Sequence, residues 1–293
     1  MKIKKTILAV VLLLLCSVGA ATPAPEEDPL VPAFKPKTAH VPIIMYHMVT
    51  KNSKLVGKHG IYPAELEADL KYLKDQGYET VVMEDLIAFV RKGKALPKKP
   101  IMLTFDDGNS GDYQYLYPLL QQYDMKAVLS ILGSATDHCT TVAEKDAAAN
   151  PDKPRKYPHA TWPQIKEMAD SGRVELQNHS YDLHGSKGSG QRQGESEADY
   201  HKRLKEDLAK MQKRLKEETR AKATTFTYPL GIISDSSQAV LEDIGLVASL
   251  SCHDGMNILT EGDLDCLFRL KRDNRPSGEP VQTVLEKMRG RSG

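Results

Sequence analysis

Short apolar runs that alternate with segments of helical period constrain the fold of this chain more than any other feature. Seven of these runs have the length of buried strands, namely residues 41–46, 80–83, 101–105, 127–132, 174–176, 224–228 and 246–250. Between most of them apolar residues recur at helical spacing, as in Leu66, Leu70 and Leu73. A longer series is Tyr200, Leu204, Leu208, Met211 and Leu215. This alternation predicts an α/β fold of parallel βα units, either a barrel or a doubly wound sheet.

The first twenty residues have the pattern of a secretory signal peptide. Lys2, Lys4 and Lys5 precede an apolar run at residues 7–16, and small residues follow up to Ala20. Because this run is shorter than the roughly 20 residues of a membrane-spanning helix, cleavage is favoured over an anchor. We therefore expect an exported protein that is secreted, bound at the cell surface or periplasmic, with no stable membrane span after cleavage.

The remaining chain divides into a short linker and one domain. Residues 21–40 contain five prolines and predict an extended linker, and residues 41–293 predict a single folded domain. The whole chain has 40 basic and 39 acidic residues, so it lacks the basic excess that is typical of nucleic-acid binding proteins. Hydrophobic residues make up 40% of the chain, which argues against an intrinsically disordered protein.

Three cysteines lie beyond the predicted signal peptide, at Cys139, Cys252 and Cys266. Export would place them in a compartment where disulfides form. A bond between Cys252 and Cys266 is one expectation, and buried reduced thiols are the alternative, because spacing alone does not fix the pairing.

Two adjacent carboxylates follow the apolar run at residues 101–105. Asp106 and Asp107 would stand at the carboxyl end of a buried strand, where α/β folds place their functional sites. Two carboxylates so close together raise each other's pKa unless one of them is paired or bound to a cation. A bound cation is one interpretation. The alternative is an Asp-Asp-Gly turn that begins a helix near Ser110.

Two histidines follow the run at residues 174–176 and favour the cation. His179 and His184 are five residues apart, a spacing that shares no face of a helix and points to opposite sides of a strand. They converge only if the chain turns back through Tyr181 and Asp182. One carboxylate and two imidazoles with an open position are typical of catalytic Zn²⁺, although Co²⁺, Ni²⁺, Mn²⁺ and Fe²⁺ also suit these ligand types.

Three segments resemble, in order, the first three motifs of the NodB-like polysaccharide deacetylases, carbohydrate esterase family 4. They are residues 104–108, His179-Ser180 with His184, and residues 226–231. The five-residue histidine spacing and the pair Tyr46-His47 resemble the poly-N-acetylglucosamine deacetylase branch, in which the motif with the general acid is permuted to the first strand. The likeness covers residues 41–272. It implies a distorted or incomplete (β/α) barrel of about seven parallel strands, with residues 41–293 as the catalytic domain.

The resemblance also implies the metal site and the base. Asp107, His179 and His184 would hold a divalent metal, most simply Zn²⁺, and Asp106 would be the general base for the attacking water. The implied reaction removes N-acetyl groups from an extracellular N-acetylglucosamine polysaccharide.

The remaining implied roles concern the acid and the substrate. His47 would protonate the departing amine, and its place after the first strand agrees with this role. His253 is the less favoured alternative for the acid. For the other histidines, no group of partner residues that would form a site with them is expected; these are His40, His59, His138, His159 and His201. A backbone N–H near Leu230 would help to stabilise the oxyanion, so the expected substrate-binding residues are Tyr228, Pro229 and Leu230.

The chain departs from the family pattern in ways that leave questions open. The third motif lacks the arginine of many members, so the group that holds Asp106 is not identified. Residues 133–160 predict a long polar loop, either a wall of the substrate groove or an insertion without function. The expected partner is an acetylated polysaccharide. A peptidoglycan or acetylxylan deacetylase, or a non-catalytic exported glycan-binding protein, are the alternatives.

Overall fold

The computed structural model describes residues 36–149, 157–186 and 188–291. The predicted signal peptide and the linker up to residue 35 lie outside the described residues. Among the residues that are described, no helix has the length and apolar character needed to cross a membrane.

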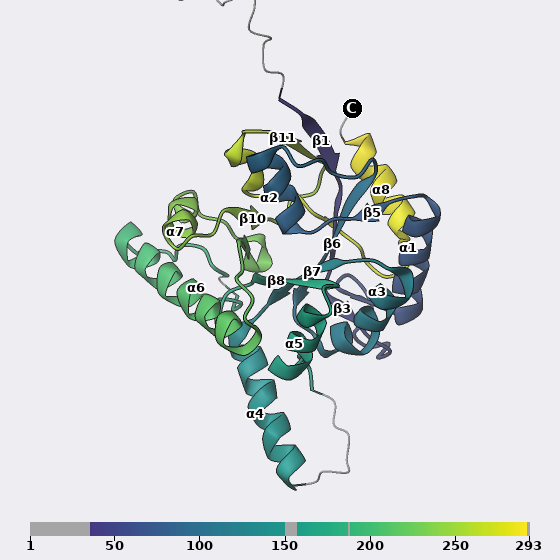
Figure 1. The fold of residues 1–293 in the computed structure, drawn as a ribbon. Coiled ribbons are helices and arrows are strands. Elements are labelled where there is room, and N and C mark those ends of the chain that lie inside the picture. Colours follow the sequence, from purple (N-terminus) through teal and green to yellow (C-terminus); the bar gives the residue numbers. More distant parts are fainter. Residues whose placement is uncertain (1–35, 150–156, 187, 292–293) are drawn as a thin grey trace, which may run out of the picture. The chain divides into compact units, whose positions relative to one another are not determined.

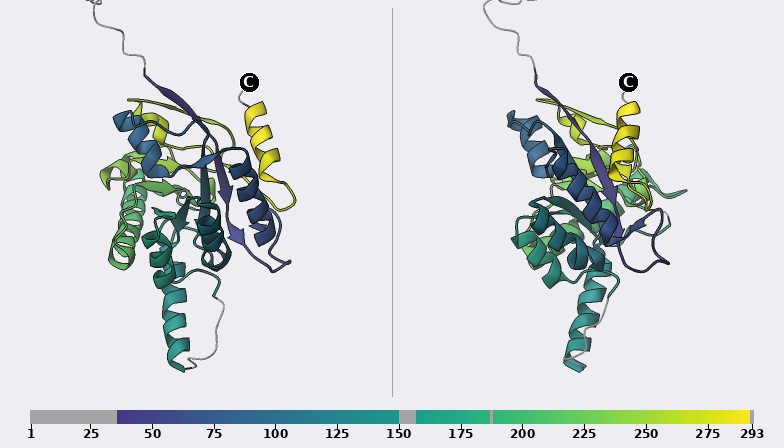
Figure 2. Two further views of the ribbon diagram at one scale, coloured as in Figure 1. Left: turned by 45° about the vertical axis from the view of Figure 1, so that its right-hand side comes forward. Right: turned by 90° about the vertical axis from the view of Figure 1, so that its right-hand side faces the viewer.

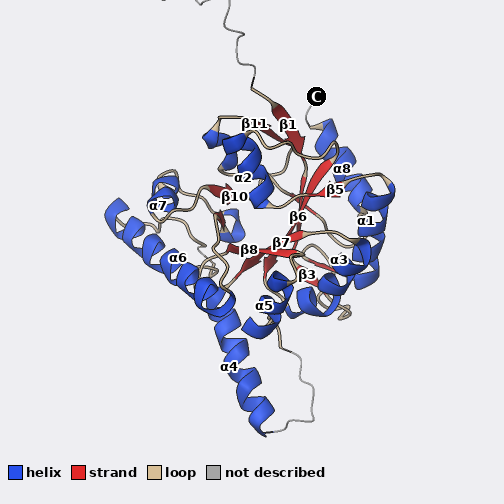
Figure 3. Ribbon diagram, viewed as in Figure 1, coloured by secondary structure: helices blue, strands red, loops and turns tan. Residues whose placement is uncertain are grey.

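A curled parallel sheet forms the centre of the domain (Figures 1 and 3). Its strands run in the order β10-β9-β8-β7-β6-β2-β12, and β5 pairs with β6 in addition. The bounds are β2 (Ile43–Tyr46), β5 (Glu79–Thr80), β6 (Pro100–Asp107), β7 (Ala127–Ile131), β8 (Val174–Asn178), β9 (Thr225–Thr227), β10 (Ala248–Leu250) and β12 (Asp273–Asn274). The seven strands of the main path curl into a half-barrel, which confirms the predicted incomplete (β/α) barrel.

Two short pairs of strands accompany the half-barrel. β1 (Thr38–Val41) pairs antiparallel with β11 (Asn257–Thr260). β3 (Met48–Val49), which follows His47, pairs in parallel with β4 (Gly60–Ile61). Sequence analysis predicted neither pairing. β3 and β4 have two residues each, which is too short to show an apolar period, and most of β1 lies within residues 21–40, where a linker was expected. The run at residues 41–46 is divided between β1 and β2 at Pro42, which has no N–H to donate to a neighbouring strand.

Helices surround the strands (Figure 3). Their bounds are α1 (Pro63–Asp75), α2 (Met83–Lys92), α3 (Tyr117–Tyr123), α4 (Gly133–Ala149), α5 (Trp162–Asp170), α6 (Glu197–Thr219), α7 (Ser237–Asp243) and α8 (Val281–Gly290). Three short helical segments are η1 (Asp112–Leu116), η2 (Pro229–Gly231) and η3 (Leu264–Leu267). The predicted apolar faces of α1 and α6 are buried, and Ser196 caps α6 by accepting a hydrogen bond from the N–H of Asp199.

The sheet has apolar packing on both faces. In β6, Ile101, Leu103 and Phe105 belong to one buried cluster, whereas Met102 belongs to another. This alternation follows from the two-residue period of a strand. The Phe105 ring also stacks on Tyr46 of the neighbouring strand, with ring centroids 4.8 Å apart. Both faces of β6 are thus fixed, which holds the residues at its carboxyl end in place.

The prediction of a long polar loop at residues 133–160 is wrong for its first part. Residues Gly133–Ala149 form α4, which projects away from the rest of the domain (Figure 2). The sequence obscured this helix because few of its side chains are buried, so it lacks a broad apolar stripe. Its carboxyl half is rich in alanine, the strongest helix former. Residues 150–156 lie outside the described part of the chain.

Two smaller expectations also need correction. The run at residues 80–83 is not one strand, because β5 ends at Thr80 and α2 begins at Met83. The considered disulfide between Cys252 and Cys266 is not formed, and Cys139, Cys252 and Cys266 are all free thiols. Cys139 is buried and the other two are half-buried.

Candidate metal centre and active site

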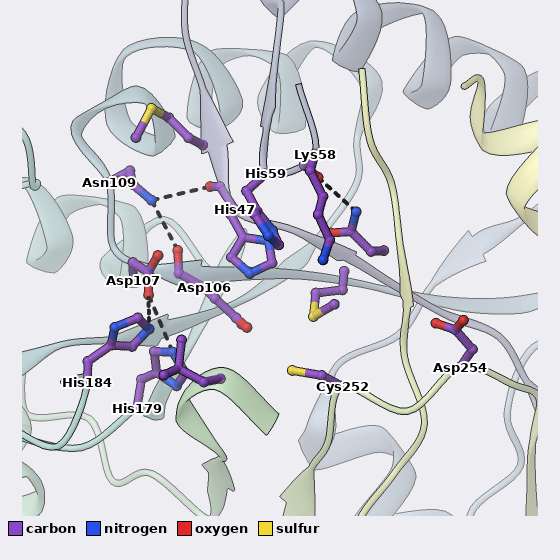
Figure 4. Close-up of a pocket in the computed structure, with 14 residues that line it drawn as sticks. His47, Lys58, His59, Asp106, Asp107, Asn109, His179, His184, Cys252 and Asp254 are labelled. Carbon is purple, nitrogen blue, oxygen red and sulfur yellow. Dashed lines mark hydrogen bonds and ion pairs between the residues drawn. The ribbon is translucent and has the colours of Figure 1, made fainter. Parts of the chain in front are cut away.

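A cavity of about 700 Å³ opens at the carboxyl ends of the strands. Strand register explains why it forms there, since Asp107 of β6 lies opposite Ile131 of β7, and Ile131 lies opposite Asn178 of β8. The chain then leaves each strand at the same edge of the sheet. The residues that sequence analysis placed after β2, β6 and β8 therefore gather in one cavity, with His47, Asp106, Asp107, His179 and His184 among those that line it (Figure 4).

Asp107, His179 and His184 form a compact cluster. One ligand atom from each lies within 4.8 Å of the others. Oδ1 of Asp107 is 3.2 Å from Nε2 of His184 and 3.4 Å from Nε2 of His179. The rings of the two histidines meet edge to face, with centroids 5.3 Å apart. The structure thus brings together the three residues that sequence analysis grouped as metal ligands.

A tight turn brings the two histidines together. Ser180 has a positive φ of 78°, and the N–H groups of Tyr181 and Asp182 both donate to the carboxylate of Asp207 on α6, at 2.7 and 2.9 Å. This is the reversal through Tyr181 and Asp182 that the spacing required. Asp207 was not identified from the sequence, where it is one of several acidic residues on the polar face of a long helix.

The cluster fits a divalent cation. Oδ1 of Asp107 is buried and accepts no well-directed hydrogen bond from the described residues, as expected of an atom that binds a metal. Nδ1 of His179 donates to the carbonyl oxygen of Thr227 at 2.8 Å, which leaves Nε2 with a free lone pair facing Asp107. Burial raises the pKa of Asp107, but the nearby imidazoles of His179 and His184 outweigh this effect and hold the pKa below its ordinary value.

Asp106 is held by a buried arginine from the far end of the chain. The guanidinium of Arg272, next to β12, contacts both carboxylate oxygens at 2.8 and 2.9 Å, and the two side chains are 0% and 2% exposed. Burial raises the pKa of Asp106, but the charge of Arg272 outweighs this effect and the pKa lies below its ordinary value. Arg272 therefore supplies the cation that the third sequence motif lacks.

Sequence reasoning missed Arg272 for a physical reason. The sequence offered one signal for such a partner, namely that a buried carboxylate needs a cation beside it. This signal does not say which of the 40 basic residues of the chain is the partner. Arg272 is 166 positions from Asp106, and β12 is a two-residue strand without a recognisable pattern. The parallel pairing of β12 with β2 brings the two residues together.

His47 lies on another wall of the cavity (Figure 4). Its Nδ1 is buried and has no hydrogen-bond partner among the residues that the structure describes. Burial lowers the pKa of His47, and the nearby carboxylates of Asp106 and Asp107 partly oppose this shift. His253, the alternative acid, is exposed and does not line this cavity.

Two histidines for which no partner was expected lie at the site. The ring of His59 packs edge-on against His47, with centroids 4.6 Å apart, and it also lines the cavity. Nδ1 of His159 is 3.1 Å from the carbonyl oxygen of Asp107 and donates to it. The expectation that they stand alone is therefore wrong. Pairing of β3 with β4 places His59 beside His47, and such a short pairing leaves no trace in the sequence.

Of the three expected substrate-binding residues, only Leu230 lines the cavity. Its side chain is 51% exposed, and its φ of 57° lies in the left-handed region that favours glycine. Tyr228 is buried instead, and its hydroxyl lies 2.7 Å from Oγ of Ser237. Pro229 is buried as well. A direct sugar contact by the Tyr228 ring is thus not possible in this arrangement.

Comparison with known families now identifies the chain. The model of the polysaccharide deacetylase family matches residues 93–249, which is more than half of the chain and includes Asp106, Asp107, His179 and His184. The chain belongs to the polysaccharide deacetylase family. The predicted family and the predicted class of hydrolase are confirmed by this match.

Sequence relatives agree with the family assignment. A poly-β-1,6-N-acetyl-D-glucosamine N-deacetylase of Escherichia coli is 28% identical over 243 residues, and one of Staphylococcus aureus is 28% identical over 197 residues. These matches cover 76% and 67% of this chain, but only 35% and 62% of the relatives. A Bacillus subtilis relative, YxkH, named provisionally as a polysaccharide deacetylase, is 26% identical over 86% of this chain and 78% of its own.

Solved structures share the fold. A de-N-acetylase from Aggregatibacter actinomycetemcomitans superposes with a TM-score of 0.68 and 24% identity, over 85% of this chain and all of the other. The Streptococcus pyogenes deacetylase PplD superposes with a TM-score of 0.67 and 19% identity, over 86% of this chain and 99% of the other.

Proposed function

We propose that this protein is a metal-dependent hydrolase that removes N-acetyl groups from an extracellular N-acetylglucosamine polysaccharide. One observation carries the proposal. Three candidate metal ligands, Asp107, His179 and His184, share a cavity with a second carboxylate, Asp106, and with the half-buried imidazole of His47. These groups are the minimum for hydrolysis of an amide by an activated water, namely a cation site, a base and an acid.

Asp107, His179 and His184 would hold the metal. When bound there, a divalent cation such as Zn²⁺ supplies a Lewis acid for the acetyl carbonyl group and lowers the pKa of a water. Neutral Nε2 atoms and one ionised carboxylate suit Zn²⁺ or Co²⁺, and the hydrogen bond from His179 to Thr227 fixes the ring in the required orientation.

Asp106 would act as the general base. Its two contacts with Arg272 keep the carboxylate ionised in a buried position, so that it can accept a proton from the attacking water. The same contacts fix the orientation of the carboxylate, because a guanidinium holds it in a planar, bidentate geometry.

His47 would act as the general acid. Its low pKa makes the protonated ring a strong proton donor toward the departing nitrogen. A backbone N–H near Leu230 would face the oxyanion. The bond between the acetyl carbon and nitrogen breaks, and the products are acetate and a glucosamine residue.

The names of the relatives support the choice of polymer, since the E. coli and S. aureus proteins are named as acting on poly-β-1,6-N-acetyl-D-glucosamine. An exported location also follows from this proposal, because such a polymer is extracellular and residues 1–20 have the pattern of a signal peptide.

Acetate release from N-acetylglucosamine oligomers tests the proposal. We expect release that stops with a chelator, returns with Zn²⁺ or Co²⁺, and is lost in Asp106→Asn. Asp235→Asn is the matched control, because Asp235 is fully exposed and does not line the cavity. If the metal-loaded protein released acetate only from acetylated xylan or only from peptidoglycan fragments, the proposed substrate would be wrong. No release from any of these substrates would refute the deacetylase activity and favour a glycan-binding protein.

A further inference from the structure

A second cavity of about 330 Å³ lies beside the active-site cavity. Met48 and Asn109 line both cavities, so the two are neighbours that share one wall. The second cavity lies between the chain around β3, the residues that lead into η1, and residues 157–158. Lys51, Tyr115 and Tyr157 are among the residues that line it.

The second cavity is held at a fixed position relative to the two catalytic-site aspartates. The N–H of Ser110 donates to the carbonyl of Pro158 at 3.0 Å, and the N–H of Ala160 donates to that of Gly108 at 2.9 Å. Gly111 packs so tightly that a Cβ atom there would collide with the carbonyl oxygen of Val49. A ligand in the second cavity would thus lie at a defined distance from the reacting group.

The chemistry of the second cavity suits a sugar. The half-buried ring of Tyr115 has the ammonium of Lys51 5.5 Å from its centroid, and Tyr157 offers a second half-buried ring. Aromatic faces pack against the apolar face of a pyranose, and the neighbouring polar side chains, such as Asn52 and Gln114, can bond its hydroxyl groups. A polymer that enters the first cavity must place its adjoining sugars on surfaces that border it.

We propose that the second cavity binds the sugar next to the one that loses its acetyl group, and that it selects a neighbour that is still N-acetylated. This inference rests on the proposed function. Among the described residues that line the second cavity, Lys51 is the one that carries a charge. A glucosamine neighbour carries an ammonium group, which Lys51 repels, whereas an N-acetylglucosamine neighbour is uncharged. The first cavity differs, because three of its lining residues are the carboxylates Asp106, Asp107 and Asp254.

Substitution of Tyr115 tests the location. In Tyr115→Ala we expect kcat/KM for an N-acetylglucosamine tetramer to fall about tenfold, chiefly through KM, because an aromatic contact is lost. Hydrolysis of a small aryl acetate ester, which needs the first cavity only, should not change. Tyr115→Phe is the matched control, since it keeps the ring face. Binding of the tetramer to Asp106→Asn, with and without Tyr115→Ala, gives a readout that needs no turnover and should weaken to the same degree.

Substitution of Lys51 tests the selection. Wild-type protein should have a higher kcat/KM for the fully acetylated tetramer than for a partly deacetylated one. Lys51→Gln should reduce the ratio of these two kcat/KM values several-fold, and high salt should reduce it as well. Equal ratios in wild type and variant would refute the selection, and equal tetramer binding with and without the Tyr115 ring would refute the location. If wild type releases acetate from none of the substrates, the proposed function itself fails, so the two failures are distinguishable.

Discussion

Replacing Arg272 with methionine should destabilise the protein by about 3–5 kcal/mol at neutral pH, because it leaves a buried carboxylate without its counter-charge. The magnitude follows from the structure. Asp106 is 2% exposed and accepts two charge-assisted hydrogen bonds from Arg272 at 2.8 and 2.9 Å. Nε of Arg272 also donates to the carbonyl of Ser251 at 2.7 Å, so this acceptor loses its partner as well. Arg272→Lys keeps the charge but loses the bidentate geometry, and we expect an intermediate effect.

The same substitution should shift the pH dependence of activity. Burial raises the pKa of Asp106 and Arg272 lowers it, so removal of the guanidinium leaves the effect of burial less opposed. The pKa of Asp106 then rises, and the acid limb of the activity profile should move to higher pH. In wild type, the stability contributed by ionised Asp106 is present above the ordinary aspartate pKa of about 3.9 and is lost as the pH falls through the lower folded-state pKa.

Urea unfolding and acetate release between pH 4 and 9 measure the two effects. A double-mutant cycle with Asp106→Asn isolates the pair, and we expect a coupling of about 2–3 kcal/mol. A coupling below about 0.5 kcal/mol, together with an unchanged acid limb, would refute the view that Arg272 holds and ionises the base.

Three further predictions concern other parts of the site. Asp207→Ala removes the acceptor for the N–H groups of Tyr181 and Asp182, so Zn²⁺ affinity, measured by competition with a chromophoric chelator, should fall about 10–100-fold; unchanged affinity would show that the turn holds itself. Burial, and then the charge of Asp107, raise the pKa of the fully buried Asp112 carboxyl. As the pH rises, Asp112 therefore ionises in the unfolded protein before it ionises in the folded one, and this destabilises wild type. Between about pH 4 and 7, Asp112→Asn should gain stability relative to wild type, by about 1.4 kcal/mol per unit of raised pKa. If the melting temperatures of the two proteins changed with pH in the same way, this prediction would be wrong. Leu230→Gly relieves the positive φ at this residue and should raise the free energy of unfolding, measured with urea, by about 0.5–1 kcal/mol. A lower free energy of unfolding in the variant would show that the backbone of Leu230 is not strained.

Much of the fold could be predicted from the sequence because the signals are local. The apolar residues of α1 and α6 recur at helical spacing, and the buried runs of β6, β7 and β8 show their length directly. Where the local signal was weak, prediction failed. The alanine-rich α4 was expected to be a loop because few of its side chains are buried, and β3, β4 and β12 have only two residues each.

The candidate site divides in the same way. The sequence by itself determined that Asp106 and Asp107 stand at the carboxyl end of a strand and that His179 and His184 follow another. Parallel strands place such residues at one edge of the sheet. Only the tertiary structure decided that Arg272 pairs with Asp106, that Asp207 fixes the turn between the histidines, and that His59 packs on His47. These contacts join segments whose approach depends on strand register and helix packing. No local pattern encodes that approach, because the free energy that selects it comes from burying the whole core at once.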